Sequence, residues 1–357
     1  MDKPTGITPS VGVKMFTIMK RLAGFYLAKP VILDDGMAEA WLRDHADITV
    51  VTSKSPLASI KPVINVNSSA LIIDPPIEVE ALDAHISGIH TPWIVGIGAG
   101  RIMDASKYLA MRTKRKLCLI PSALSTTSWL NMAIALRKNG SLFFPGTKHA
   151  TTTIVDPTFI AKAPPSLTLG GIADILAACS AITDWKISGE KTGEKVSSRG
   201  VEAFKVLVEK IIGQASAYKQ FSRESILLVY ETFLEALSLC GASFSGRPVE
   251  GSEHFLYYFA EEECRRKFVH GEIIALMTIL SLKMQGNRAA IAPERLKAFF
   301  KEIGVPCDPR DLSMTRDEMG RILRGITSFV ASKHPYSILN EHDVAADEQL
   351  MDWLFSS

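Results

Sequence analysis

The stretch Trp93–Lys107 reads W-I-V-G-I-G-A-G-R-I-M-D-A-S-K and decides the fold of the first half of the chain. Its apolar start predicts a buried strand, residues 96–100 predict a flexible turn, and residues 102–111 predict a helix. Glycines let the backbone approach a ligand, and a helix N-terminus offers free N–H groups and a positive dipole end. The pattern is typical of a turn that holds a pyrophosphate, and a purely structural tight turn is the alternative.

Short apolar runs alternate with helical patterns on both sides of this turn. Further strands are predicted at residues 30–33, 48–51, 70–73 and 117–121, and further helices at 37–43 and 78–88. Strands that alternate with helices predict a parallel sheet covered on both faces.

The pattern changes after Pro164-Pro165, where nearly every segment is helical. Helices are predicted at residues 169–187, 198–218, 225–239, 254–268, 271–284, 293–303, 316–328 and 343–355. We therefore expect two domains: a dinucleotide-binding α/β domain over residues 1–164, and an all-α domain that binds metal and substrate over residues 165–357.

Composition excludes several classes of protein. The 357 residues are 47% hydrophobic and 22% charged, with a formal net charge of +2, which is ordinary for a soluble globular protein. Such a charge gives no strong field toward nucleic acid or an anionic membrane, so we expect a small-molecule partner. The five cysteines form no C-x-x-C pair, which favours a reducing, cytoplasmic compartment.

Three residues far apart in the chain have the composition of one metal site. Asp174, His254 and His270 each stand in a helical context beside small residues. One carboxylate and two imidazoles form a catalytic zinc ligand set that leaves a coordination position open. The alternatives are a carboxylate that stabilises a helix N-terminus and histidines that are structural. Together, a metal and a dinucleotide indicate alcohol oxidation or ketone reduction.

Charged residues near the glycine turn are candidates for cofactor binding. Asp104 lies four residues after Gly100, and Lys107 follows one turn later on the same helical face. Asp34 and Asp35 end the first predicted strand, where a carboxylate can accept hydrogen bonds from the adenosine ribose and repel a 2′-phosphate. This placement favours NAD over NADP.

These segments resemble the superfamily of glycerol dehydrogenase, sn-glycerol-1-phosphate dehydrogenase, iron-containing alcohol dehydrogenase and 3-dehydroquinate synthase. The resemblance covers about residues 30–286, and its motifs occur in the family's order. They are Gly98–Lys107, Pro121-Ser122, Ile154–Asp156, Ala163-Pro164, Gly170–Asp174, Gly251–His254 and His270–Glu272. Asp184-Trp185, Gly189-Glu190 and Gly251–His254 are most similar to the glycerol-1-phosphate dehydrogenase branch.

The resemblance implies a dehydroquinate synthase-like fold with the active site between an N-terminal Rossmann-like domain and a C-terminal helical domain. It implies Asp174, His254 and His270 as metal ligands. Gly98, Ala99, Gly100, Asp104 and Lys107 match the nucleotide loop, and Ser122 and Thr126 lie in the segment that lines the nicotinamide side. A homo-oligomer is the family's habit.

Departures from the family pattern refine this expectation. Iron enzymes add a histidine where this chain has Ala178, so a three-ligand Zn²⁺ site is favoured. Ala99 replaces the middle glycine of the loop, Thr127 stands where dehydrogenases place a substrate-binding aspartate, and Tyr258 replaces a second histidine. A threonine is a weaker acceptor than a carboxylate, and a tyrosine titrates far from neutrality.

The leading hypothesis is a metal-dependent NAD(P)-linked oxidoreductase that interconverts a small, phosphorylated polyol and its ketone. Tyr258 would relay a proton, and Thr127 would face the substrate. Lys148, Arg247 and Arg265 are candidates for meeting a substrate phosphate. A sugar-phosphate cyclase is an alternative, although the lysine-bearing Gly-Gly-Lys segment of the cyclases is absent from the sequence. A non-catalytic relative is the third possibility.

Overall fold

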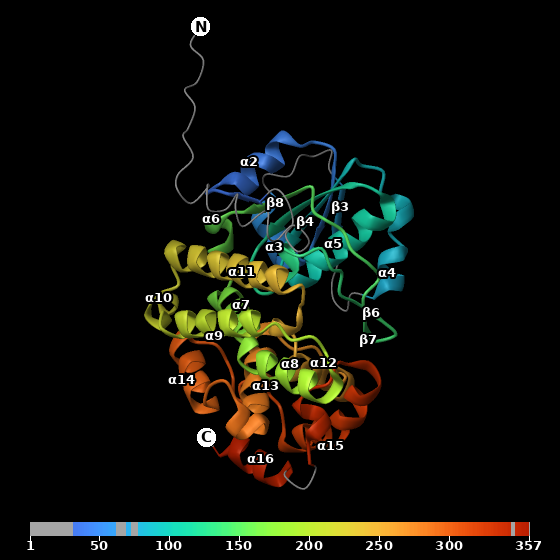
Figure 1. The fold of residues 1–357 in the computed structure, drawn as a ribbon. Coiled ribbons are helices and arrows are strands. Elements are labelled where there is room, and N and C mark those ends of the chain that lie inside the picture. Colours follow the sequence, from blue (N-terminus) through green and yellow to red (C-terminus); the bar gives the residue numbers. More distant parts are fainter. Residues whose placement is uncertain (1–30, 62–68, 73–77, 344–346, 357) are drawn as a thin grey trace.

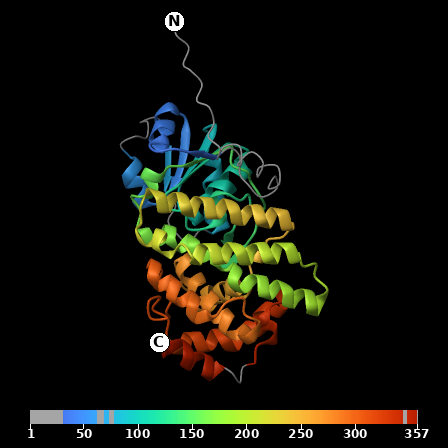
Figure 2. The same cartoon turned by 60° about the vertical axis from the view of Figure 1, so that its left-hand side comes forward.

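The computed structural model describes residues 31–61, 69–72, 78–343 and 347–356 of the chain. Figure 1 and Figure 2 both show the sheet and its helices at one end of the molecule. The helices from α13 onward lie at the other end, and the long helices α9 and α11 lie between the two.

Six parallel strands form the sheet, in the order β1-β8-β5-β4-β2-β3. Their bounds are β1 Val31–Leu33, β2 Ile48–Thr52, β3 Ser69–Ile72, β4 Trp93–Gly98, β5 Lys116–Pro121 and β8 Thr152–Val155. Strands β2 and β8 consist of isoleucine, valine and threonine and are buried along their whole length. Runs of β-branched residues buried on both faces are typical of a parallel sheet, so the predicted α/β class is confirmed.

The helices of this half follow the strands. They are α2 Met37–Asp44, α3 Lys54–Ile60, α4 Val79–Asp83, α5 Gly100–Thr113 and α6 Pro157–Ile160, with the 3₁₀ turns η1 Ile86–Gly88 and η2 Thr127–Trp129. The predicted helix at 78–88 is therefore split into α4 and η1. An antiparallel hairpin, β6 Leu136–Lys138 and β7 Ser141–Phe143, was not predicted. Its turn residues, Asn139 and Gly140, both have positive φ, as a two-residue hairpin turn requires.

From Pro165 onward, every regular element in the described part of the chain is a helix. The α-helices are α7 Pro165–Leu176, α8 Ala178–Thr192, α9 Ser198–Ile212, α10 Ala215–Lys219, α11 Arg223–Ser243, α12 Ser252–Cys264, α13 His270–Gln285, α14 Pro293–Ile303, α15 Arg316–Lys333 and α16 Asp347–Phe355. The 3₁₀ turns are η3 Arg247–Val249, η4 Gly286–Arg288 and η5 Ile338–Glu341. Two predicted helices are each divided: 169–187 into α7 and α8, and 198–218 into α9 and α10.

One cluster of buried apolar residues joins the sheet to the helical half. It includes Leu119 of β5, Ile172 of α7 and Phe233 of α11, while separate clusters lie on the outer side of the sheet and among the later helices. The ring of Trp129, in η2, lies 5.8 Å from the ring of Tyr230 and 5.8 Å from that of Phe233. The segment after β5 therefore packs against α11 and shares this cluster with α7, the helix that carries Asp174.

Two helical stretches are long and apolar enough to cross a membrane by length and composition. These stretches are Pro165–Thr192 and Arg223–Ser243, and 89% and 61% of their most apolar windows are buried inside the protein. Burial of this kind is also what the core helices of a globular protein show, so the two stretches are weak evidence of a membrane span.

Candidate metal centre and cofactor turn

The crossing of α7 and α13 brings two of the predicted metal ligands together. At this crossing Gly170 meets Gly271: a Cβ on Gly170 would lie 3.2 Å from the Cα of Gly271, and a Cβ on Gly271 would overlap the backbone of Gly170. Asp174 lies one helical turn after Gly170, on the same face, and His270 directly precedes Gly271. The close approach of two backbones therefore sets the distance between the carboxylate and the imidazole.

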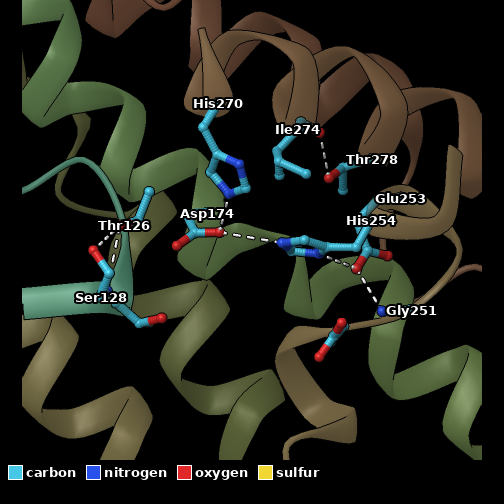
Figure 3. A network of polar contacts seen from close by, with 12 residues as sticks. Thr126, Ser128, Asp174, Gly251, Glu253, His254, His270, Ile274 and Thr278 are labelled. Carbon is cyan, nitrogen blue, oxygen red and sulfur yellow. Dashed lines mark hydrogen bonds and ion pairs between the residues drawn. The ribbon is translucent and has the colours of Figure 1, made fainter. Parts of the chain in front are cut away.

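Asp174, His254 and His270 meet at one point. The Oδ1 atom of Asp174 lies 3.0 Å from Nε2 of His270 and 3.3 Å from Nε2 of His254. One potential ligand atom from each residue lies within 4.8 Å of the other two. Figure 3 shows both rings pointing toward the carboxylate, one from α13 and one from α12. The side chains of Asp174 and His254 are each 8% exposed, whereas that of His270 is 24% exposed, so solvent reaches the centre on the His270 side.

The electrostatics of this centre depend on the two imidazoles. Burial alone would raise the pKa of Asp174, but the charges and hydrogen bonds of His270 and His254 hold it well below its usual range. Burial alone would lower the pKa of His254, but hydrogen bonds to Asp174 and Glu253 raise it to about 10. A carboxylate and two imidazoles that converge in a buried position fit a divalent cation that prefers oxygen and nitrogen ligands.

Tyr258 lies next to this centre but is bonded elsewhere. Its ring centroid is 6.0 Å from that of His254, and its hydroxyl donates a hydrogen bond of 2.9 Å to Oε1 of Glu250. Burial and the charge of Glu250 raise the pKa of Tyr258 well above its ordinary value, so the hydroxyl keeps its proton at neutral pH. No sequence pattern predicted a role for Glu250.

The glycine turn joins β4 to α5 as predicted. Strand β4 ends at Gly98, Ala99 is the N-cap residue, and α5 begins at Gly100. A Cβ on Gly100 would lie 2.8 Å from Oγ1 of Thr126, so the segment after β5 packs directly against the turn. Only a residue without a side chain fits here.

The segment after β5 connects the turn to the metal helix. The backbone N–H of Leu124 donates to Oγ1 of Thr168 at 3.3 Å, and its carbonyl lies where a Cβ on Gly171 would be. Thr126 contacts Gly100 and also accepts a hydrogen bond from the N–H of Ser128 at 3.3 Å. Figure 3 shows Thr126 and Ser128 on the Asp174 side of the view. This segment, which begins at Ser122, therefore spans the space from the turn to α7.

Thr127 is occupied by a local contact. Its hydroxyl oxygen accepts a hydrogen bond of 2.9 Å from Nδ2 of Asn131, and it begins the 3₁₀ turn η2. In the described part of the chain it shares no hydrogen bond with the three clustered residues. Thr127 therefore lies beside Thr126 in the segment after β5, but in the described residues it is not hydrogen bonded to the candidate metal ligands.

Asp104 and Lys107 form a buried ion pair beneath the turn. Nζ of Lys107 lies 2.7 Å from Oδ1 of Asp104, and it also donates to Oδ1 of Asn131 and to the carbonyl of Ala133. The three donors of the ammonium match these three acceptors, and its side chain is fully buried. Lys107 therefore holds the segment after η2 against α5, and this leaves it no spare donor for a phosphate.

Asp34 follows β1, and two strands, β8 and β5, separate β1 from the glycine turn at the end of β4. At a spacing of about 4.8 Å a strand, the ends of β1 and β4 are about 14 Å apart. The carboxylate of Asp34 accepts from the N–H of Asp35, and Asp35 pairs with Arg223 of α11.

The strand that borders β4 on its other side is β2, which ends at Thr52. The role expected for Asp34 at the adenosine ribose, and with it the preference for NAD over NADP, stays a prediction.

The three basic residues suggested for a substrate phosphate are not grouped together. Arg247 is 9% exposed and donates to the carbonyls of Glu250 and Tyr336, which is a structural role. Arg265 ends α12 with a positive φ. The backbone of Lys148 donates to the carbonyl of Met132. None of them shares a hydrogen bond with the metal centre in the described residues.

A different basic group lies beside His270. The ring of Tyr257 meets that of His270 edge-on at 5.0 Å, and its hydroxyl accepts from Arg137 of β6 at 3.4 Å. Arg137 and Lys267 both pair with Glu261, and the charges of Glu261 and Arg137 also act on Arg101. Two cations thus pair with Glu261, and Arg101 lies within its electrostatic reach. No periodic pattern in the sequence indicated this group, because its members come from α5, β6, α12 and the loop before α13.

Comparison with known proteins shows that the chain is similar to dehydrogenases. Residues 64–164 match the iron-containing alcohol dehydrogenase family. The glycerol-1-phosphate dehydrogenase [NAD(P)+] of Thermoplasma acidophilum is 27% identical over 271 residues, which cover 76% of this chain and 74% of that protein. The resemblance drawn from the sequence is therefore confirmed.

Solved structures share the fold. A probable glycerol dehydrogenase from Sinorhizobium meliloti superposes with a TM-score of 0.68 at 18% identity, covering 93% of this chain and 98% of that chain. A sulfoacetaldehyde reductase from Bifidobacterium kashiwanohense, solved in complex with NAD+, has a TM-score of 0.65 at 17% identity, with coverages of 93% and 98%. The predicted combination of a Rossmann-like sheet with an all-helical remainder is the fold of these enzymes.

Proposed function

We propose that this relative of the glycerol-1-phosphate dehydrogenases is a metal-dependent, NAD(P)-linked oxidoreductase that interconverts a small, phosphorylated polyol and its ketone. The convergence of Asp174, His254 and His270 on one point carries the proposal. The glycine turn supports it, because the segment after β5 contacts both that turn and α7. A redox cofactor and a metal ion could therefore face the same substrate.

The three clustered residues would hold the metal, and Zn²⁺ is the ion that we propose. A cation held there would supply a Lewis acid for the substrate oxygen, while the nicotinamide cofactor carries the hydride chemistry. Ala178 offers no fourth ligand, so three ligands and one open position remain, as in catalytic zinc sites. The partial exposure of His270 leaves a side from which substrate can approach.

The other site residues would bind and orient. The backbone at Gly98, Ala99 and Gly100 would hold the pyrophosphate, and Asp104 and Lys107 would keep α5 in place beneath it. Ser122 and Thr126 would line the nicotinamide. Thr127 offers a neutral hydroxyl to the substrate side where the family's dehydrogenases have a carboxylate.

A proton would be handled by Tyr258 and Glu250. The ring centroid of Tyr258 lies 6.0 Å from that of His254, and the tyrosine hydroxyl is already hydrogen bonded to Glu250. A proton that leaves the substrate could therefore pass through the tyrosine to a carboxylate that is in contact with solvent at its edge.

The basic group beside His270 supports a phosphorylated substrate. Arg101, Arg137 and Lys267 outnumber the single carboxylate of Glu261, so an added anion would find net positive charge there. Tyr257 contacts both Arg137 and His270, which places this charge next to the metal centre.

We also propose that the enzyme is a cytoplasmic homo-oligomer with the two domains expected from the sequence, divided at residue 164. Five free cysteines, four of them buried, support a reducing compartment. The oligomer rests on the family resemblance alone, and light scattering on the purified protein would measure its size.

The experiment is a steady-state assay of the zinc-reconstituted protein that follows NADH or NADPH absorbance. We expect reduction of dihydroxyacetone phosphate, loss of the activity on chelation, and recovery with added zinc. Because charge-assisted hydrogen bonds contribute about 1.5–3 kcal/mol, kcat/KM should be at least about tenfold higher for the phosphorylated ketone than for dihydroxyacetone. Asp174→Ala should abolish turnover, while Asp352→Ala, at an exposed position of α16, should leave it unchanged.

Three results would contradict this proposal. Turnover that survives complete removal of metal would exclude the metal centre from the reaction. Bound NAD that never accumulates as NADH during conversion of a sugar phosphate would indicate a cyclase. A protein that binds neither nucleotide nor zinc would be a non-catalytic relative.

A further inference from the structure

We propose that Glu253 is a positioning residue that holds the imidazole of His254 with Nε2 directed at Asp174, and that Asp184 fixes the turn on which both residues stand. This inference rests on the proposed metal site and adds a second layer of buried carboxylates to it. It assigns Glu253 no contact with the substrate or the metal.

Every oxygen of Glu253 is used. Oε1 lies 2.9 Å from Nδ1 of His254 and accepts from the N–H of Gly251 at 2.7 Å. Oε2 accepts from the hydroxyl of Ser180 in α8 at 2.6 Å. The side chain is 0% exposed. Three contacts to a side chain without solvent leave it a single orientation, so the ring that it touches is fixed as well.

Neighbouring residues on a helix do not normally face each other, and the helix start explains the exception. Helix α12 begins at Ser252, so Glu253 and His254 lie in its first turn. The carboxylate turns back to accept a hydrogen bond from the N–H of Gly251, just before the helix. This places its oxygen beside Nδ1 of the imidazole. Figure 3 shows Glu253 beside His254, on the side of the ring away from Asp174.

The contact also selects the tautomer of His254. A carboxylate accepts hydrogen bonds, so in the neutral ring that a metal requires Nδ1 carries the proton, and Nε2 is the nitrogen that can bind the metal. A carboxylate that accepts from a metal-bound histidine raises the basicity of the ligand and fixes the plane of its ring. Losing such a partner typically lowers metal affinity by about 10–100-fold.

Asp184 of α8 holds the same turn in place through hydrogen bonds. Oδ2 accepts from the N–H of Ser252 at 2.7 Å, and Oδ1 accepts from Nε2 of Gln285 at 3.1 Å and from the N–H of Ile338 at 3.0 Å. The turn before α12 is thereby tied to α8, α13 and η5. Burial and the nearby charge of Glu253 raise the pKa of Asp184 to about 6.

The carboxylates of this layer have imidazole rather than ammonium or guanidinium partners. Asp174, Glu253 and Asp184 are buried, and in the described part of the chain none of them forms an ion pair with a lysine or an arginine. The imidazole of His254 contacts both Asp174 and Glu253, and its pKa is raised to about 10. A divalent cation held at the three-ligand point would take over the charge that this ring supplies.

The test measures metal affinity without cofactor or substrate. Zinc binding is followed by competition with a chromophoric chelator, and the Co²⁺-substituted protein reports ligand geometry through its visible absorption. We expect Glu253→Ala to weaken zinc binding by about 100-fold and to alter the Co²⁺ spectrum. Glu253→Gln, which can still accept from Nδ1 but lacks the charge, should weaken it by about tenfold. Glu263→Gln on the same helix, whose carboxylate pairs with Arg321, is the matched control.

The outcomes separate this inference from the proposed function. If the wild-type protein binds zinc and Asp174→Ala abolishes binding, but both Glu253 variants bind normally, Glu253 has only a structural role and the inference is overturned. If the wild-type protein binds no zinc, both proposals fail. Should Glu253→Ala not fold, Glu253→Gln decides the question, since it keeps the size of the side chain.

Discussion

The glycine turn and the metal centre differ in the partners of their buried carboxylates. Beneath the turn, the carboxylate of Asp104 is paired with the ammonium of Lys107, three residues away on the same helix. In the metal centre, Asp174 and His270 lie 96 positions apart, and no lysine or arginine among the described residues pairs with the carboxylate. The first region is complete within the chain, whereas the second fits an added cation.

Under the proposed function, the ion pair beneath the glycine turn stabilises the fold, and the metal centre takes part in the reaction. A buried pair made within one helix supports the turn whether or not a ligand is present. A carboxylate held by two imidazoles can exchange their protons for a metal ion, because the same imidazole nitrogens bind a proton or a metal. Removing charge from the two regions should therefore have different consequences.

The largest expected effect is on stability beneath the turn. Asp104→Asn leaves the fully buried ammonium of Lys107 without its charged partner, and breaking a buried pair in this way costs about 3–5 kcal/mol. Asp174→Asn also removes a stabilising partner of His254 and His270, but it should cost the metal-free protein less, because the two imidazoles can release their protons. Denaturant unfolding of both metal-free variants checks the contrast. Equal losses of stability would show that the two regions do not differ as described.

A second, smaller effect concerns the packing that assembles the metal centre. Gly271→Ala places a Cβ into the backbone of Gly170, and such overpacking typically costs about 1–3 kcal/mol. Because α7 and α13 must then separate, zinc affinity should also fall. Gly286→Ala at the end of the same helix meets no atom within 4 Å, although its positive φ strains it, so it should lower stability without affecting zinc affinity. Unchanged zinc binding in Gly271→Ala would show that the crossing does not set the site.

The smallest expected effect lies where the two regions meet. Arg137 of the hairpin and Lys267 pair with Glu261 of α12. Burial raises the pKa of Glu261, but the two cations outweigh it and lower that pKa below the ordinary 4.5. Its contribution to stability is therefore present above pH 4.5 and is lost as the pH falls through the lowered folded-state pKa.

Glu261→Gln should reduce stability by about 1 kcal/mol at neutral pH, with the difference from wild type vanishing in acid. Unfolding free energies of the two proteins, measured from neutral to acidic pH, check the sign. Glu209→Gln, which breaks an exposed pair with Arg295, is the control and should change stability less. A Glu261→Gln difference that grows in acid would contradict the assignment.

Local sequence patterns were enough for much of the fold. The strand, glycine turn and helix at 93–113 and the helix at 293–303 lie where the pattern predicts them. Patterns of this kind work because each element depends on its own spacing of apolar residues. The division of 169–187 at Ala177 was missed, since α7 and α8 are both buried and apolar and no proline or glycine marks the break.

Local sequence patterns predicted only part of the candidate site. Asp174, His254 and His270 were chosen by residue type and by resemblance, whereas the distance of Asp34 from the glycine turn depends on strand order, which is not encoded in any single strand. Glu253 stands next to His254 in the sequence, but no pattern predicted its role, since its partners come from α8 and from the backbone before α12. Arg137 lies on a hairpin that was not predicted.

The sequence by itself determined the elements that depend on neighbours along the chain: the strands, the helices, the turn after β4 and the kinds of ligand available. Only the tertiary structure decided which strand borders that turn, which glycines let α7 and α13 approach, and which carboxylates have a cation beside them. The physical reason is that these properties belong to pairs of residues brought together by packing, and the energy of such a pair depends on the distance between its members, which no local pattern contains.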